Sequence, residues 1–336
     1  MKKVINNPDD FAREAIEGLA LAYPQYIRQI PGLQAVLRKD APVAGKVTIL
    51  TGGGSGHDPM FSGYVGRGMA DVSVAGNVFA SPPPPPIYEA AKAAHSGAGV
   101  LFLYGNYSGD ILNFDMAAEM LEQEQIAVKT VRVADDVASA PPELLHERRG
   151  IAGDLFVIKV AGARAEEGAT LAEVAAAAEK AVHCTRSMGV ALSSCVIPAS
   201  GRPIFEIGEQ EMEIGMGLHG EPGIQRGPLK PADQIVSEMV ARILADSPMK
   251  LGGEVAVLVN GFGATPLGEL LIVFRGVARC LRESGVKIWH SLIGNYAGSL
   301  DMAGFSISLM RLDADLKRWL AAPAETPAFI QTSGIG

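Results

Sequence analysis

Short β-branched apolar runs alternate with amphipathic helical patterns over the first half of the chain. The apolar runs lie at 46–50, 100–104 and 127–133, and the helical patterns lie at 87–96, 111–125 and 169–188. A strand-helix-strand order of this kind is typical of a largely parallel sheet that is covered by helices on both faces. We therefore expect an α/β fold.

The pattern changes near residue 189. Short alternating runs at 189–198, 203–207 and 211–218 indicate antiparallel strands. Helical and apolar patterns then resume as helix 231–246, strand 254–259, helix 266–284 and strand 286–293. We predict two related α/β subdomains with mostly parallel sheets, residues 1–184 and 185–336, with an antiparallel β segment in the second.

Two internal similarities support related halves. The segment LYGNYSGDILNFDMAAE (103–119) resembles LIGNYAGSLDMAG (292–304), and ILTGGGSGHDPM (49–60) resembles VLVNGFGATPLG (257–268). Each segment reads as a strand, a glycine turn and the start of a helix. A chance match between glycine-rich turns is the alternative explanation.

Composition narrows the class of protein and its partners. Of 336 residues, 48% are hydrophobic and 20% are charged, which is the balance of a globular protein. The net charge is −8 and no basic stripe is present, so we expect no nucleic-acid or membrane partner. Three cysteines without CxxC spacing indicate free thiols in a reducing compartment. With no signal-peptide pattern and no long apolar run, we expect a cytoplasmic protein.

A glycine-rich stretch, TGGGSGHDP (51–59), follows strand 46–50 directly. Such glycines let backbone N–H groups approach a ligand closely. The stretch lacks the Lys-Ser/Thr pair of a phosphate-binding loop and does not read GxGxxG, which argues against nucleotide binding here. It ends in His57 and Asp58, and Asp110 follows strand 100–104. Ligands of parallel sheets bind at the carboxyl ends of strands, so these residues are candidates for a site.

A third candidate is His219, which lies in GLHGEPGI (217–224). Flanking glycines expose its ring, and a plain surface turn is the alternative. The remaining histidines read as structural or solvated. No HxH, HExxH or Cys/His cluster is present, so the sequence predicts no metal site.

Taken together, GGGSGHDP, GNYSGDILNF and GLHGEPGI closely resemble the substrate-binding subunit of dihydroxyacetone kinases. The resemblance runs along the whole chain. It implies that His219 adds to the carbonyl carbon of a short ketose to give a hemiaminal. It also implies that His57 and Asp110 are the general acid/base pair. In such a family the substrate pocket is lined by Gly54, Ser55, Gly56 and Ser81.

The resemblance also implies partners. In members of the family the nucleotide sits on a separate helical domain, fused in some members, or on a separate helical subunit. For this chain the resemblance implies a partner subunit that carries ADP or ATP with magnesium, and no cofactor in the chain itself. The partner is either recharged by a phosphotransferase-system phosphocarrier or exchanges ATP. Members of the family are homodimers.

Three departures from the family pattern leave the substrate open. Gly105 stands where a lysine is usual, Asp58 replaces a glutamate, and Ser81 precedes five prolines (82–86). A lost lysine makes room for a four-carbon ketose such as erythrulose, whereas neutral drift would retain dihydroxyacetone. A non-catalytic ketose sensor that acts as a transcriptional coactivator, or a carrier of another carbonyl metabolite, could share His219. The presence of both His57 and Asp110 favours the kinase.

Overall fold

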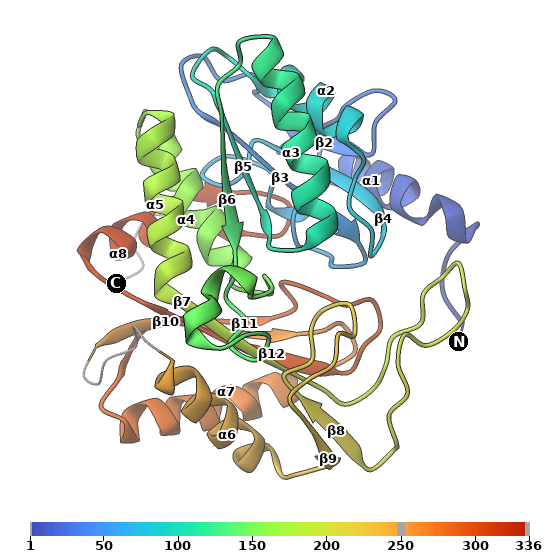
Figure 1. The fold of residues 1–336 in the computed structure, drawn as a ribbon, viewed down its shortest axis with the longest axis vertical. Coiled ribbons are helices and arrows are strands. Elements are labelled where there is room, and N and C mark those ends of the chain that lie inside the picture. The colour runs from blue at the N-terminus through green and yellow to red at the C-terminus, as the bar shows by residue number, and fades with distance from the viewer. Residues whose placement is uncertain (1, 247–252, 333–336) are drawn as a thin grey trace.

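The computed structural model describes residues 2–246 and 253–332, and its strands form two six-stranded sheets (Figure 1). The first sheet has the order β1-β2-β4-β3-β5-β6. Strands β4, β3, β5 and β6 are mutually parallel, and β1 and β2 pair antiparallel at one edge. Its members are β1 (Ile27–Gln29), β2 (Ala35–Arg38), β3 (Thr48–Ser55), β4 (Val72–Val78), β5 (Val100–Gly105) and β6 (Val128–Val133).

Helices cover both faces of this sheet, as the alternating pattern predicts. On one face, Phe102 and Tyr104 of β5 pack with α2 (Pro84–Ala94) and α3 (Ser108–Gln123). On the other, Leu101 and Leu103 pack in the cluster that contains α1 (Phe11–Ala22), α4 (Asp154–Glu166) and α5 (Leu171–Cys184). Alternate residues of a strand point to opposite faces, so a continuous apolar run is needed to bury both.

The second sheet has the order β11-β10-β12-β7-β8-β9. Only β10 and β11 pair in parallel, so the antiparallel part is larger than the sequence indicated. Helices α6 (Ala232–Ala245) and α7 (Leu267–Glu283) pack on it. Its members are β7 (Thr185–Ala191), β8 (Glu211–Ile214), β9 (Gln225–Pro228), β10 (Glu254–Gly261), β11 (Lys287–Gly294) and β12 (Gly304–Arg311).

Four local expectations need correction or completion. Strand β3 continues through the glycines to Ser55, because its ladder with β4 extends that far, so the glycine-rich stretch is not a free loop. Helix α2 begins at Pro84 rather than at residue 87, since proline is tolerated in a first turn. Residues 185–188 belong to β7, not to the preceding helix. The apolar run at 154–166, whose periodicity fits either a strand or a buried helix, is a buried helix, α4.

The internal similarities extend over the strands and glycine turns only. After β5 and β10 the chain forms helices, α3 and α7 respectively. Their counterparts differ: residues 298–303, after β11, lead directly into β12, and β3 is followed by turns. Sheet membership changes between Cys184 and Thr185. One apolar core nevertheless includes residues of both halves, such as Leu103 and Leu258, and the two-subdomain division stays a proposal.

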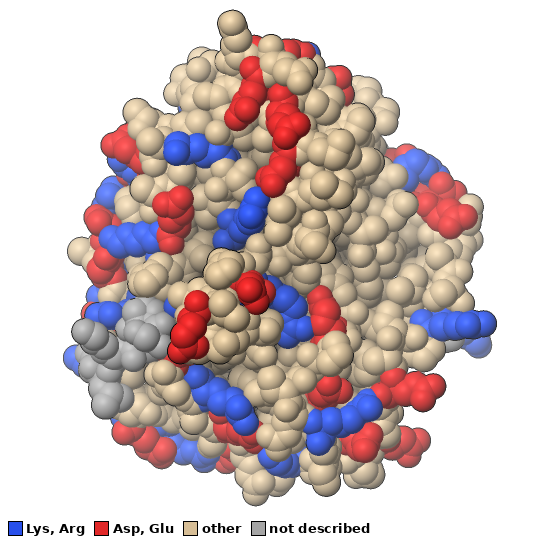
Figure 2. All heavy atoms as spheres, in the orientation of Figure 1, with Lys and Arg blue, Asp and Glu red and all other residues tan. Residues whose placement is uncertain are grey.

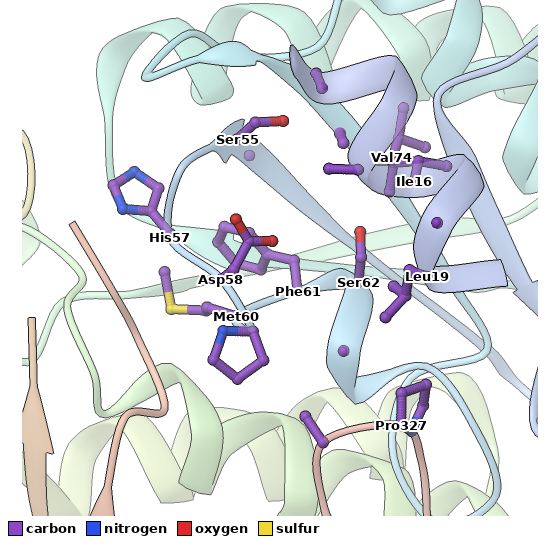
Figure 3. Close-up of a pocket in the computed structure, with 18 of the residues that line it drawn as sticks. Ile16, Leu19, Ser55, His57, Asp58, Met60, Phe61, Ser62, Val74 and Pro327 are labelled. Carbon is purple, nitrogen blue, oxygen red and sulfur yellow. The ribbon is translucent and has the colours of Figure 1, made fainter. Parts of the chain in front are cut away.

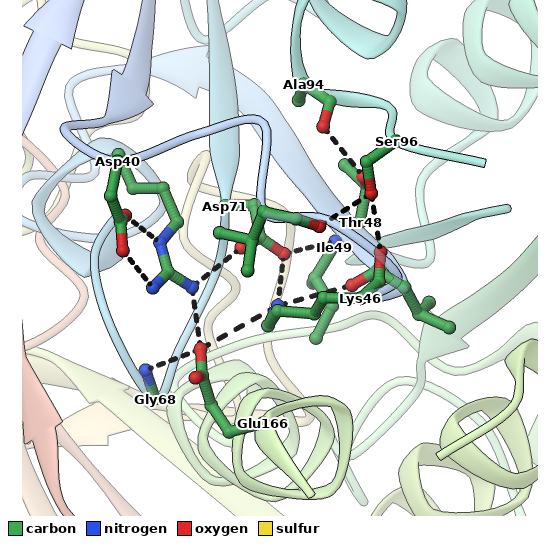
Figure 4. Close-up of polar contacts among 12 residues, drawn as sticks. Asp40, Lys46, Thr48, Ile49, Gly68, Asp71, Ala94, Ser96 and Glu166 are labelled. Carbon is green, nitrogen blue, oxygen red and sulfur yellow. Dashed lines mark hydrogen bonds and ion pairs between the residues drawn. The ribbon is translucent and has the colours of Figure 1, made fainter. Parts of the chain in front are cut away.

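A buried ion network ties α4 to the first sheet (Figure 4). Arg38 Nη1 donates to Asp71 Oδ1 at 2.9 Å and to Glu166 Oε1 at 2.6 Å. Lys46 Nζ donates to Asp71 Oδ2 at 2.6 Å, and the same oxygen accepts from the backbone N–H of Ile49. Each buried charge thus has an opposite charge within hydrogen-bond reach, as buried charges require.

The two short strands β13 (Ala324–Glu325) and β14 (Ile330–Gln331) pair with each other after α8 (Ala314–Ala321), which returns to pack on α4. On the face drawn in Figure 2, acidic and basic side chains are interspersed. Among the described residues, no helix is long and apolar enough to cross a membrane.

Candidate active site

The loop that carries His57 is held by the second half of the chain. Gly56 turns the backbone at the end of β3 with a φ of +97°, a conformation that glycine adopts readily. The backbone N–H groups of Gly298 and Leu300 then donate to the carbonyls of His57 (3.0 Å) and Gly56 (2.8 Å). The two similar segments therefore differ in role. Residues 103–119 lead from β5 into α3, whereas residues 292–304 contain Gly298 and Leu300, which hold the loop of His57.

His57 and His219 meet through their Nε2 atoms, which lie 2.9 Å apart. His57 Nδ1 lies 2.9 Å from the carbonyl oxygen of Gly298, and His219 Nδ1 lies 3.0 Å from Glu221 Oε1. Since carbonyl and carboxylate oxygens only accept, both Nδ1 atoms carry hydrogen. If both rings were neutral, the lone pairs of the two Nε2 atoms would face each other and repel. One additional proton between the two Nε2 atoms makes the contact a hydrogen bond.

The environment keeps that proton off His57. Burial and, to a smaller extent, the charge of the adjacent His219 together lower the pKa of His57 to about 3. Burial acts to raise the pKa of Glu221, but the hydrogen bond and charge of His219, with Arg149, lower it to about 2. The Glu221 carboxylate therefore remains ionised beside His219. The arrangement is a carboxylate, an imidazole that it orients, and a second imidazole that accepts from the first.

Aromatic rings enclose this pair. The ring of Phe79 stacks on His57 with centroids 5.0 Å apart, and the ring of Tyr107 meets His219 edge-on at 4.7 Å. Tyr107 is itself fixed by a hydrogen bond from its hydroxyl to the carbonyl of Gly150, at 2.9 Å. His219 keeps 24% of its side chain exposed, whereas His57 is buried. Of the two rings, His219 is therefore the accessible one.

Asp110 lies in the first turn of α3, at the carboxyl end of β5. Its Oδ1 is buried and has no hydrogen-bond partner among the described residues. Burial raises the pKa of Asp110 to about 6, although the Ser81 hydroxyl and the charge of His219 act to lower it. A half-buried carboxyl with an unused oxygen and a pKa near neutrality is suited to accept a proton from a ligand.

The other predicted pocket residues divide in role. Gly54 lets the turn at Phe79 and Ala80 approach, since a Cβ at Gly54 would lie 2.7 Å from the Ala80 nitrogen. The Ser55 hydroxyl donates to the carbonyl of Gly76 at 2.7 Å and so reinforces the pairing of β3 with β4. Ser81 lies beside Asp110, as the effect of its hydroxyl on that carboxyl shows.

Asp58, the second titratable residue of the glycine-rich stretch, lies apart from the imidazole pair. It lines a cavity of about 370 Å³ between β3 and α1, together with apolar residues such as Ile16 and Phe61 (Figure 3). His57 borders this cavity, but His219, Asp110 and Ser81 do not. Within residues 2–246 and 253–332, no group of three or more His, Cys, Asp or Glu side chains is arranged to hold a metal ion.

Known proteins resemble this chain over most of its length. The sequence model of the Dak1 domain matches residues 17–328. The chain belongs to the Dak1 domain family. It is 46% identical over 330 residues to a PTS-dependent dihydroxyacetone kinase, dihydroxyacetone-binding subunit DhaK, of Listeria innocua, covering 98% of this chain and 99% of that one. It is 42% identical over 333 residues to an L-erythrulose kinase of Pectobacterium atrosepticum, of which it spans 56%.

Two solved structures of Dak1-like chains are also similar. The dihydroxyacetone kinase of C. freundii, in complex with AMP-PNP and Mg²⁺, superposes with a TM-score of 0.91 at 34% identity, over 98% of this chain and 61% of that one. A dihydroxyacetone kinase operon co-activator superposes with a TM-score of 0.88 at 31% identity, over 95% and 98% of the two chains. These similarities confirm the predicted family and its α/β fold.

Sequence reasoning missed several residues of this Dak1 site. Glu221 was part of the quoted motif, and its position two residues after His219 could have suggested an orienting carboxylate. Phe79 and Gly298 carried no local signal, because both reach the imidazoles only through tertiary packing. Tyr107 precedes Asp110 by one helical turn, but its contact with His219 joins the two halves of the chain.

Proposed function

We propose that this Dak1 chain is the substrate-binding subunit of a ketose kinase. It binds a short ketose covalently through Nε2 of His219 and presents a terminal hydroxyl for phosphorylation. The observation that carries the proposal is the contact between the two Nε2 atoms at 2.9 Å, with each Nδ1 fixed on an oxygen. Nδ1 of His219 is held by the Glu221 carboxylate, so Nε2 is the ring nitrogen that attacks, once His57 has accepted its proton.

The covalent step balances with the residues present. The Nε2 proton of His219 passes to Nε2 of His57, which leaves a lone pair on His219. That pair forms a bond to the carbonyl carbon while the carbon–oxygen π bond opens, and His57 returns the proton to the oxygen. Glu221 stabilises the positive charge that stays on the His219 ring. A polyol lacks a carbonyl carbon and cannot take this step, so selectivity against glycerol follows.

Asp110 then acts as general base toward the hydroxyl that is phosphorylated. Its unpartnered Oδ1 is free to accept that proton, and its pKa of about 6 leaves it ionised at neutral pH. Proton transfer of this kind contributes roughly a hundred- to ten-thousand-fold in rate. Gly54, Gly56 and Ser55 shape the wall behind the imidazoles, and Ser81 orients Asp110.

The phosphoryl donor belongs to a partner. We propose a separate helical subunit that carries ADP or ATP with magnesium, in line with the AMP-PNP and Mg²⁺ of the C. freundii kinase complex. The Listeria relative is PTS-dependent, which supports a phosphotransferase-system phosphocarrier as the source of phosphate. We expect the chain to form a homodimer and to work in the cytoplasm. Dihydroxyacetone and erythrulose are both candidate substrates, given the names of the two relatives.

A coactivator function is the second candidate, because an operon co-activator has a similar fold. A sensor needs covalent capture by His219 but no general base. Asp110 has a buried oxygen without a partner among the described residues and a pKa of about 6, which suit a general base and favour the kinase.

Intact-protein mass spectrometry under gentle ionisation tests the covalent step. Wild-type protein is incubated with dihydroxyacetone, erythrulose or glycerol, beside His219→Ala and, as a matched control, His183→Ala on α5. We expect a mass increase of one ketose in wild type and in the control, none in His219→Ala, and none with glycerol. An adduct that persists in His219→Ala would refute the proposal.

A further inference from the structure

Asp154, the first residue of α4, is a second buried carboxyl near this site, and no step above uses it. Only 1% of the residue is exposed. Neither of its carboxyl oxygens has a hydrogen-bond partner among the described residues. Burying a polar group without a partner costs stability, so a carboxyl with both oxygens unused is rarely kept without a reason.

Asp154 faces the end of β5 at a position where that strand has no side chain. Tyr104 stacks on Phe114 of α3, so the next residue of the strand, Gly105, faces the opposite side, toward α4. A Cβ placed on Gly105 would lie 3.4 Å from Asp154 Oδ2 and 3.3 Å from the ring of Tyr107. Any larger side chain at position 105 would therefore cover the carboxyl of Asp154.

The same contacts connect Asp154 to the covalent histidine. Tyr107, which borders the space at Gly105, is the ring that meets His219 edge-on at 4.7 Å. Burial raises the pKa of Asp154 well above its usual range, and the charges of Asp135 and Asp110 add to that effect. The raised pKa favours the protonated carboxyl, which can both donate and accept a hydrogen bond.

A further unused polar atom lies on the same face of the sheet. A Cβ on Gly52 would touch the Phe114 ring, so Thr51, one residue earlier in β3, points toward α4. Thr51 pairs with Leu103 of the neighbouring strand β5, and its buried hydroxyl oxygen has no partner within the part of the chain that the structure describes. Thr51 in β3 and Asp154 at the start of α4 thus carry oxygens without a partner among the described residues, on the same face of the sheet.

We infer that Asp154 is a specificity residue that binds a hydroxyl of a ketose longer than three carbons. This inference rests on the proposed function. Dihydroxyacetone has one hydroxyl on each side of its carbonyl, whereas erythrulose has one more, on an arm longer by one carbon. Gly105 adds no side chain over the buried carboxyl of Asp154, and the ring of Tyr107 borders both the space at Gly105 and His219.

Competition between the two ketoses tests the inference on the full chain. The protein is incubated with equal concentrations of dihydroxyacetone and one enantiomer of erythrulose, and the ratio of the two adducts is read by intact mass. The measurement is repeated with the other enantiomer. Loss of one hydrogen bond to a buried group lowers a binding constant about tenfold or more. We expect Asp154→Leu to lower the ratio of erythrulose to dihydroxyacetone by that factor and Asp154→Asn to lower it less. We expect Gly105→Ala to lower it too, because a methyl group covers the carboxyl.

A melting measurement separates this role from a structural one. Removing an unpaired buried carboxyl should leave the melting temperature of Asp154→Leu equal to or above that of wild type. Asp135→Asn is the control, because both Asp135 oxygens accept backbone N–H groups, at 2.8 and 3.0 Å, and its loss should destabilise the protein. If Asp154→Leu does not fold, Asp154→Asn and Gly105→Ala decide the test.

The outcomes are distinguishable. Adducts whose ratio is unchanged in all three variants would overturn the role of Asp154 and leave the proposed function intact. A lowered ratio together with unimpaired folding supports it. If wild type forms no adduct with any ketose, the proposed function fails and this inference fails with it.

Discussion

Two regions of the molecule bury carboxyl groups. In one region the carboxylate is paired with cations, and in the other the carboxyl oxygens lack partners among the described residues. In the network of Figure 4, Asp71 accepts from Arg38, Lys46 and a backbone N–H. In the site, one oxygen of Asp110 and both of Asp154 have no hydrogen-bond partner within residues 2–246 and 253–332. A paired buried carboxylate holds elements together, whereas an unpaired one lowers stability and is available to a ligand. The difference in pairing therefore separates a structural from a functional group of acids.

The largest effect is expected at Asp110. Asp110→Asn removes the general base but keeps the shape of the side chain. We expect phosphorylation of the ketose by the assembled kinase to fall by roughly a hundred- to ten-thousand-fold, while the covalent adduct on His219 still forms. Steady-state turnover and intact mass are measured on the same sample. Wild-type turnover in Asp110→Asn would remove this residue from the mechanism.

Removing a carboxylate from the buried ion network should instead lower the stability of the fold. Asp71→Asn leaves Lys46 and part of Arg38 buried without their partner, and we expect the free energy of unfolding to fall by about 3–5 kcal/mol. Denaturant titration measures this. The control is Asp115→Asn, which removes an exposed pair with Arg132 at 3.1 Å and should cost at most about 1 kcal/mol. Equal losses in the two variants would contradict the comparison.

The pH dependence of stability gives an independent reading of Asp110. Its pKa is raised from 3.8 to about 6 in the folded protein, so folding favours the protonated acid. This contribution is fully present below pH 4 and is lost as pH rises through about 6. A change of this size corresponds to about 3 kcal/mol. Relative to wild type, Asp110→Asn should gain stability by up to that amount between pH 4 and pH 7, as measured by denaturant titration at each pH.

A smaller effect is expected at Glu221, which orients His219 without touching the ketose. Glu221→Gln weakens the hold on Nδ1, and we expect adduct formation to slow about ten- to a hundredfold, as for other groups that orient a reactive histidine. Stopped reactions read by intact mass follow the rate. Glu213→Gln is the matched control, since Glu213 accepts from the backbone of Gly223 and does not contact the imidazole. A rate unchanged in Glu221→Gln would show that Glu221 has no part in the step.

Much of the fold and the outline of the site could be predicted from local patterns. Apolar runs marked β3 and β5, because a strand buried on both faces must be apolar. β-branched residues marked the half-buried edge strand β6. His57 and Asp110 stood out because they follow predicted parallel strands, where ligands bind, and His219 stood out because glycines flank it. The second sheet was harder, since short strands of four residues such as β8 and β9 leave little pattern from which to read their direction.

Only tertiary structure decided which of these residues work together. The contact of His57 with His219 joins positions 162 residues apart in the chain. With Phe79, Gly298 and Glu221, the site draws on four segments of the chain. Pairing between buried acids and bases is likewise invisible along the chain, because an aspartate has the same side chain whether or not a cation faces it. Local periodicity reports burial, whereas protonation and reactivity depend on the neighbours that folding supplies.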